Sequence, residues 1–184
     1  GVLVDLAPYG IDRGTRVQSI VEAGIDLVCF SGDKLLGGPQ CGIIVGKSAM
    51  IQQLKKHPMT RALRVDKMIL SALEATLLSY VDGTWNENIP AHKMLTMSEE
   101  ACLEKATLFI EKLRHDLGED SPFGLSIVPT EGKVGGGTLP LQVLPGKGIQ
   151  LTHSSLSPNA LEVQLRLGAT PIVGRVDDHG LVLD

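Results

Sequence analysis

Hydrophobic residues in the first half of the chain alternate between short continuous runs and helical spacing. The runs are rich in β-branched residues and predict strands at 2–6, 25–30 and 42–46. Apolar residues spaced three or four apart predict helices at 17–23 and 48–57, and a longer helix with Asp66 as its N-cap. The stripe expected on this longer helix consists of Met68, Ile69, Ala72, Leu73, Thr76 and Leu77. Strands that alternate with helices favour an α/β fold with a mainly parallel first sheet.

The second half begins after a segment, 81–90, that contains Gly83 and Pro90 and is typical of a boundary. A helix that ends at Gly118 should turn Leu95, Cys102, Ala106, Phe109, Leu113 and Leu117 inward. Strands are expected at 125–128, 139–144, 149–152, 172–176 and 181–183, with a helix that starts at Pro158. The pattern therefore predicts a first domain at 1–83 and a small α/β domain at 84–184.

Composition narrows the possible functions of these 184 residues. Only 3% of them are aromatic and the net charge is −4, which argues against a broad nucleic-acid surface on this chain. Three cysteines without disulfide or metal-ligand spacing suit a reducing compartment, so we expect a cytoplasmic protein. No apolar run approaches the ~20 residues of a membrane span. The first residues, without a methionine, already read as part of a strand, so we expect a fragment.

The stretch FSGDKLLGGPQ at 30–40 places one lysine, Lys34, between an apolar strand and a double glycine. A lysine amine is a useful nucleophile only when it is neutral, and apolar walls would lower its pKa by desolvation. Such an amine can form a Schiff base with the aldehyde of pyridoxal phosphate (PLP), and Ser31 could offer its hydroxyl to the cofactor phosphate. The alternative is an ordinary exposed lysine at the mouth of a hairpin, with Asp33 as an exposed neighbour.

These residues resemble a known family. The segments 30–40 and 42–47 closely resemble the cofactor-lysine segment of bacterial selenocysteine synthases, the L-seryl-tRNA(Sec) selenium transferases. The resemblance returns at 57–58, 61–68, 73–77, 134–140 and 171–176 and covers most of the chain. It implies a C-terminal fragment: the end of an aspartate-aminotransferase-like PLP-binding large domain, followed by the small α/β domain. In this family the lysine aligned with Lys34 holds the PLP.

The resemblance also implies a reaction. Seryl-tRNA(Sec) would be converted to selenocysteinyl-tRNA(Sec) through a dehydroalanyl intermediate, with selenophosphate as the selenium donor and Lys34 as general base. Arg61 and Arg64 fall in the segment thought to line the donor pocket, and their spacing of three would place them on one helical or turn face. Asp33 would polarise the lysine or assist proton transfer. The family forms large rings, so we expect a homo-oligomer of dimers, with no membrane partner.

Several alternatives stay open at this point. Arg61 and Arg64 could be surface residues that pair with Asp66 or other acids, and Asp33 could be a plain turn residue. Asp5 is a second-rank candidate for the carboxylate at the PLP ring nitrogen and is better explained as structural. The nearer functional alternative is a related PLP lyase that acts on a small amino acid or amino-sugar acid. The more distant one is a non-catalytic oligomerisation module that retains the motif.

Overall fold

A computed structural model describes the chain except for residues 12–14, 136–138 and 140–141. The chain divides into two compact units. Unit 1 consists of Gly1–Thr96 with the short segment Gly135–Gln142, and unit 2 consists of Met97–Val134 with Val143–Asp184. The domain boundary expected between residues 83 and 84 concerns the whole protein and stays a prediction.

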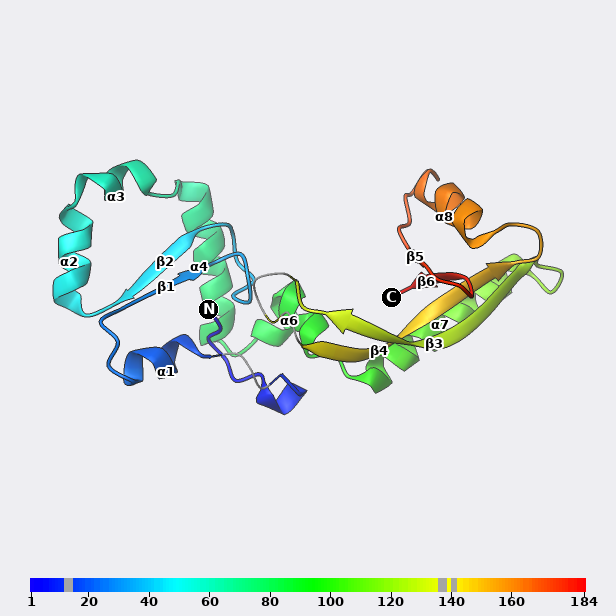
Figure 1. Cartoon of the computed structure of the whole chain (residues 1–184), viewed down its shortest axis with the longest axis horizontal. Helices are drawn as coiled ribbons and strands as arrows, with labels where there is room; N and C mark the ends of the chain where they lie inside the picture. Colours follow the sequence, from blue (N-terminus) through cyan, green and yellow to red (C-terminus); the bar gives the residue numbers. More distant parts are fainter. Residues whose placement is uncertain (12–14, 136–138, 140–141) are drawn as a thin grey trace. The chain divides into compact units, whose positions relative to one another are not determined.

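Unit 1 combines one small sheet with several helices (Figure 1). Its elements are η1 (Ala7–Tyr9), α1 (Val17–Glu22), β1 (Leu27–Ser31), β2 (Gly42–Gly46), α2 (Ser48–Lys56), α3 (Pro58–Leu63), α4 (Lys67–Val81), α5 (Trp85–Asn88) and α6 (Pro90–Leu95). The α/β class is confirmed, whereas the parallel first sheet is wrong. β1 and β2 pair antiparallel, with Leu27 opposite Gly46 and Ser31 opposite Gly42. The connection 32–41 is too short to hold the crossover helix that a parallel pair requires.

The first predicted strand is also wrong. Instead of a strand at 2–6, the structure has an isolated parallel bridge between Val2 and Arg16, followed by η1. Val2 and Leu6 are buried nonetheless. The apolar run therefore predicts burial correctly but predicts a strand wrongly. A short apolar run alone does not specify a hydrogen-bonding partner.

Local capping explains where the helices of unit 1 begin. Asp66 caps α4 as predicted, because its Oδ1 accepts a hydrogen bond of 2.9 Å from the Ile69 amide. Helix α2 begins at Ser48 as predicted, with Lys47 at the N-cap position and no side-chain capping hydrogen bond. The stripe predicted on α4 is partly wrong. Ile69, Leu73 and Thr76 are half-buried, but Met68 is 80% exposed.

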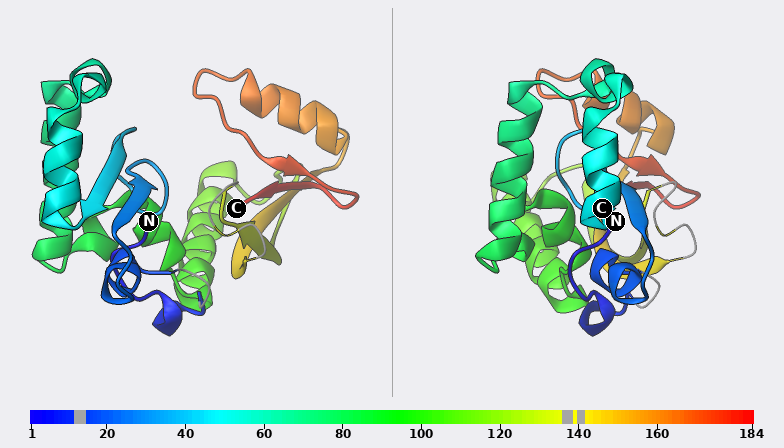
Figure 2. Two further views of the ribbon diagram at one scale, coloured as in Figure 1. Left: turned by 60° about the vertical axis from the view of Figure 1, so that its left-hand side comes forward. Right: turned by 90° about the vertical axis from the view of Figure 1, so that its left-hand side faces the viewer.

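Unit 2 is a four-stranded antiparallel sheet with two helices (Figures 1 and 2). Its elements are α7 (Glu99–Leu117), β3 (Phe123–Lys133), β4 (Val143–His153), α8 (Pro158–Arg166), β5 (Arg175–Val176) and β6 (Leu181–Leu183), with strand order β3-β4-β6-β5. Ser98 and Ser157 cap the two helices through their hydroxyls. The chain between α7 and β3 turns at Gly118, which has a φ of 77° and ends the helix as predicted.

Both helices of unit 2 contribute to one hydrophobic core. Its buried members are Ala106, Ile110, Ile149, Leu151, Leu161 and Leu181. α7 lies along the β3–β4 hairpin, as both figures show. Two residues predicted to face inward, Phe109 and Leu117, are exposed because the buried face of α7 is centred on Ala106 and Ile110. In the described part of the chain, no helix is both long and apolar enough to cross a membrane.

Candidate functional site

The lysine loop, residues 31–41, leaves the end of β1 and returns to β2 (Figure 1). Three backbone hydrogen bonds close it on itself. The Gly32 amide donates to the Cys41 carbonyl at 2.9 Å, and the Gly38 amide donates to the Gly32 carbonyl at 2.8 Å. The Gly37 amide donates to the Lys34 carbonyl at 2.8 Å, which forms a tight turn that begins at the lysine itself. The position of Lys34 is thus fixed by local backbone geometry.

Glycine is required at two positions of this loop. A Cβ at Gly32 would lie 2.5 Å from Cys41 Sγ and 2.7 Å from the Pro39 carbonyl oxygen. Gly37 has a φ of 73°, and a Cβ there would lie 2.3 Å from Ile89 Cγ2. Left-handed backbone and these close approaches both exclude ordinary side chains. The glycines next to the lysine therefore serve to fold the loop tightly onto its surroundings.

The two leucines after Lys34 anchor the loop. Leu36 is completely buried and Leu35 is nearly so, whereas Asp33 and Lys34 are exposed. Within the described residues, the side-chain amine of Lys34 has no hydrogen-bond or ion-pair partner. The expectation that apolar strands wall in the amine is not met by this chain. The loop instead presents an accessible lysine above two buried leucines that anchor its backbone.

Helix α4 and the segment after it supply the residues that support the lysine loop. The Tyr80 hydroxyl donates to the Leu36 carbonyl at 2.8 Å, and its oxygen lies 2.6 Å from His92 Nε2. A Cβ at Gly38 would lie 3.3 Å from the hydroxyl oxygen of Thr76, one helical turn before Tyr80. Burial lowers the pKa of His92, partly opposed by the nearby Leu35 backbone, and raises the pKa of Tyr80. Both side chains are therefore neutral near pH 7.

Neither His92 nor Tyr80 stands out in the sequence as a residue of this site. His92 is fully buried and contacts the tyrosine that holds the lysine loop. The available signal was weak: Thr76 and Tyr80 share one face of α4 with Ile69 and Leu73. Nothing in the sequence, however, indicates that this face meets the lysine loop.

The loop brings three predicted site residues together. Ser31 is the last residue of β1, is half-buried and pairs with Gly42. Asp33 precedes Lys34 and is exposed, with no hydrogen-bond partner among the described residues. Ser31 can therefore offer a hydroxyl on the same chain reversal that presents the lysine amine. Asp33 places a carboxylate next to that amine in sequence.

The two arginines lie on a different segment. Arg61 is in α3 and Arg64 follows the helix with extended backbone, at a φ of −64° and a ψ of 139°. Of the helical or turn face predicted from their spacing, the helical alternative is therefore excluded for Arg64. Both side chains are exposed, and in the described part of the structure neither has an ion-pair partner. The alternative pair with Asp66 is not formed, since that carboxylate caps α4. No described hydrogen bond or ion pair joins either arginine to the lysine loop.

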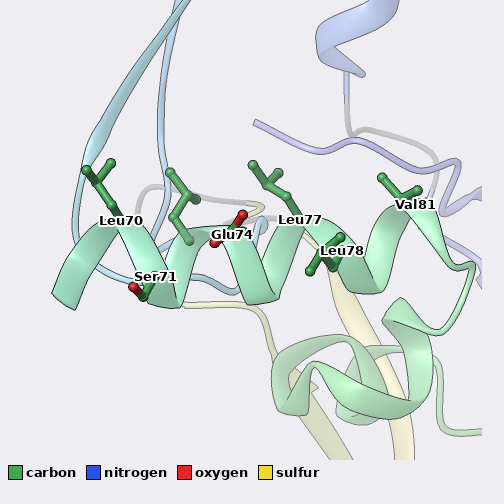
Figure 3. A pocket seen from close by; sticks show the side chains of 7 residues that line it. Leu70, Ser71, Glu74, Leu77, Leu78 and Val81 are labelled. Atoms are coloured by element: carbon green, nitrogen blue, oxygen red, sulfur yellow. The ribbon is translucent and has the colours of Figure 1, made fainter. Parts of the chain in front are cut away.

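Three other features supply no residue to the site described above. The Asp5 carboxylate accepts a hydrogen bond of 3.0 Å from the Ala7 amide at the start of η1, which supports its structural interpretation. A shallow surface groove on α4 is lined by leucines, Val81, Ser71 and Glu74, and includes none of the predicted site residues (Figure 3). The glycine triplet of the segment 134–140 lies largely outside the described residues. Among the described residues no group of three His, Cys, Asp or Glu could hold a metal ion.

Comparison with known proteins places the whole chain within one group of enzymes. The family model described as L-seryl-tRNA selenium transferase (SelA) matches residues 1–184. Curated proteins named L-seryl-tRNA(Sec) selenium transferase match over the full chain: 46% identical in Alkaliphilus metalliredigens, 42% in Desulfotalea psychrophila and 43% in Geobacter sulfurreducens. The chain spans only 39% of the length of the first two relatives and 40% of the third.

Proposed function

Because this chain belongs to the L-seryl-tRNA selenium transferase family, we propose that the whole protein converts seryl-tRNA(Sec) to selenocysteinyl-tRNA(Sec), with selenophosphate as the selenium donor. The observation that carries the proposal is the lysine loop: an exposed amine without a partner in the described structure, held by a tight turn over buried leucines. A lysine kept accessible on a rigid base suits covalent attachment of a carbonyl compound.

The residues of the loop fit PLP as the cofactor. Lys34 would hold it through the amine, and the half-buried Ser31 hydroxyl would donate a hydrogen bond to its phosphate. When bound, PLP draws electrons from the α-carbon of the attached amino acid. The amine of Lys34, once free, would take the proton from that carbon as general base. Asp33 would receive or return this proton through its exposed carboxylate.

Arg61 and Arg64 would bind the selenium donor. Selenophosphate is a small polyanion, and guanidinium groups bind such oxyanions through two parallel charge-assisted hydrogen bonds. Neither arginine is engaged by a carboxylate in the described structure, so both are available for an anion. We assign donor binding, rather than proton transfer, to these two residues.

We also propose the partners and setting of the whole protein. It would work as a homo-oligomer, a ring of dimers, in the cytoplasm. Cys29, Cys41 and Cys102 are all free thiols, which agrees with a reducing compartment. The second candidate function, a PLP lyase for a small amino acid or amino-sugar acid, would use the same lysine loop but would not need the two arginines for a selenium donor.

A single-turnover assay of the full-length protein separates these functions. Seryl-tRNA(Sec) is incubated with stoichiometric enzyme at several selenophosphate concentrations, and the aminoacyl group is identified by mass spectrometry after release from the tRNA. The selenium transferase yields selenocysteine only when selenophosphate is present. Turnover of free small amino acids, with no change of the seryl-tRNA, would overturn the proposal in favour of the lyase.

A further inference from the structure

Tyr80, which is half-buried, and His92, which is completely buried, form a polar pair that contacts the lysine loop. The pair contacts the loop at the Leu36 carbonyl, 2.8 Å from the Tyr80 hydroxyl oxygen. Leu35 and Leu36 are the two central residues of the turn that starts at Lys34 and is closed by Gly37. The tyrosine therefore holds the middle of the turn whose first residue carries the proposed cofactor amine.

The hydrogen-bond pattern defines the direction of donation. The Tyr80 hydroxyl has one proton, which it donates to the Leu36 carbonyl, so its oxygen must accept from His92 Nε2–H at 2.6 Å. His92 Nδ1 is then unprotonated, and among the described residues this buried atom has no partner. Burial keeps both groups neutral, so the donors do not change near pH 7. A one-way chain of hydrogen bonds runs from His92 through Tyr80 to the loop.

Aromatic packing keeps the pair in place. The Trp85 ring meets His92 edge to face, with ring centroids 5.1 Å apart. Tyr9 in turn packs edge to face against Trp85, with ring centroids 6.1 Å apart. His92 is completely buried, as is Leu36, so water cannot replace the tyrosine hydroxyl at the loop. The buried His92 Nδ1, which has no partner among the described residues, carries a desolvation cost that the packing around it must offset.

We propose that the Tyr80–His92 pair positions Lys34 by fixing the carbonyl at the centre of its turn. The inference rests on the proposed function, in which Lys34 carries PLP. His92 orients the tyrosine hydroxyl, Tyr80 holds Leu36, and the turn sets the direction in which the lysine leaves the backbone. Neither residue touches the reacting atoms, so both are positioning residues and not catalytic ones.

The test uses the full-length protein freed of PLP, with Tyr80→Phe as the variant because it removes the hydroxyl and keeps the ring. Two quantities are measured: hydrogen exchange of the Gly37 and Gly38 amides, and the rate at which added PLP becomes attached to Lys34. Attachment is trapped with borohydride and located by peptide mass spectrometry. The loss of one hydrogen bond should speed exchange and slow attachment about 3- to 10-fold each.

Tyr9→Phe is the matched control. It makes the same substitution in the same aromatic cluster, and the Tyr9 hydroxyl has no partner among the described residues. It should leave both readouts within twofold of the wild type. At His92, Gln keeps a side-chain donor and should retain part of the wild-type rate, whereas Leu should reproduce the Tyr80→Phe defect.

The outcomes separate this inference from the proposed function. Wild-type attachment at Lys34 with unchanged loop exchange and rate in Tyr80→Phe overturns the positioning role and leaves the function standing. A uniform rise in exchange that includes the paired amides of β1 and β2 also overturns it, because the pair would then serve global stability only. If wild-type Lys34 attaches no PLP, the proposed function fails, and the inference, which rests on it, fails with it.

Discussion

The lysine loop carries Lys34, and the segment 58–64 carries Arg61 and Arg64, but the two segments differ in how they are held. The lysine loop has a completely buried leucine, glycines at close contacts, and a tyrosine hydroxyl bound to its backbone. Every residue of α3, Pro58–Leu63, is exposed, and so is Arg64 after it. The packing of this chain therefore defines the geometry of Lys34. The geometry of the arginines is expected to become fixed only when their anion binds.

The largest effect that this comparison predicts is at Lys34. Replacement of Lys34 by Ala in the full-length protein should abolish covalent PLP attachment and selenium transfer, because no second amine lies on the loop. The fold should persist, since the side chain is exposed and without a partner in the described structure. Absorbance spectra, single-turnover assays and circular dichroism measure the three properties. A yellow, active variant would contradict the assignment.

The next effect concerns the rigidity of the loop. Gly37→Ala should destabilise the full-length protein by about 2 kcal/mol or more, because it forces a side chain into left-handed backbone and against Ile89. Gly42→Ala is the matched control, since a Cβ at that position meets nothing within 4 Å. Denaturant midpoints of the two variants make the comparison. Equal midpoints would mean that the loop is not held as described.

Replacement of Arg61 or Arg64 by Ala should show the opposite behaviour, with a functional defect and no loss of stability. Each loss of a charge-assisted hydrogen bond is worth about 1.5–3 kcal/mol, so the apparent affinity for selenophosphate should fall by roughly one to two orders of magnitude. PLP attachment should be unaffected. Lysine at either position should restore only part of the affinity, because an ammonium lacks the planar fork. Single-turnover rates at varied selenophosphate concentration measure this. An unchanged dependence on selenophosphate in both alanine variants would mean that the arginines are ordinary surface residues.

The smallest effect is a pH dependence of stability that comes from His92, which supports the lysine loop. Burial lowers the pKa of folded His92 below its ordinary value of 6.5, which the unfolded chain keeps. The unfolded state then binds more protons below about pH 6.5, so stability is full above that pH and is lost as the pH falls through the lowered folded pKa. Denaturant midpoints measured between pH 7.5 and pH 5 should fall less in His92→Leu than in the wild type. A steeper fall in the variant than in the wild type would contradict a lowered pKa for folded His92.

Local signals predicted the parts of this structure that depend on neighbours in sequence. The Asp66 cap, the helix end at Gly118 and the glycine-rich reversal after Lys34 all follow from residue chemistry within a few positions. The spacing of Arg61 and Arg64 allowed a helical or a turn face, and the helical one is excluded because the chain leaves α3 before Arg64, which has extended backbone.

Contacts between residues far apart in the sequence could not be predicted from local patterns. The run at 42–46 was correctly predicted as a strand, but nothing in it specified an antiparallel partner. The support of the lysine loop joins Leu36 to Tyr80, 44 positions away, and Tyr80 to His92, 12 positions away. Composition and periodicity do not indicate which distant residues form such pairs. The sequence could therefore indicate the lysine but not what holds it.

The central claim is that Lys34 is the residue that binds PLP in the whole protein, and one measurement tests it most directly. Full-length protein purified with its cofactor is reduced with borohydride, digested, and mapped by tandem mass spectrometry. The account predicts a single reduced phosphopyridoxyl group, on Lys34, with Lys47, at the other end of the β1–β2 hairpin, unmodified. Modification of another lysine with Lys34 untouched, or no modification in a yellow protein, would contradict it.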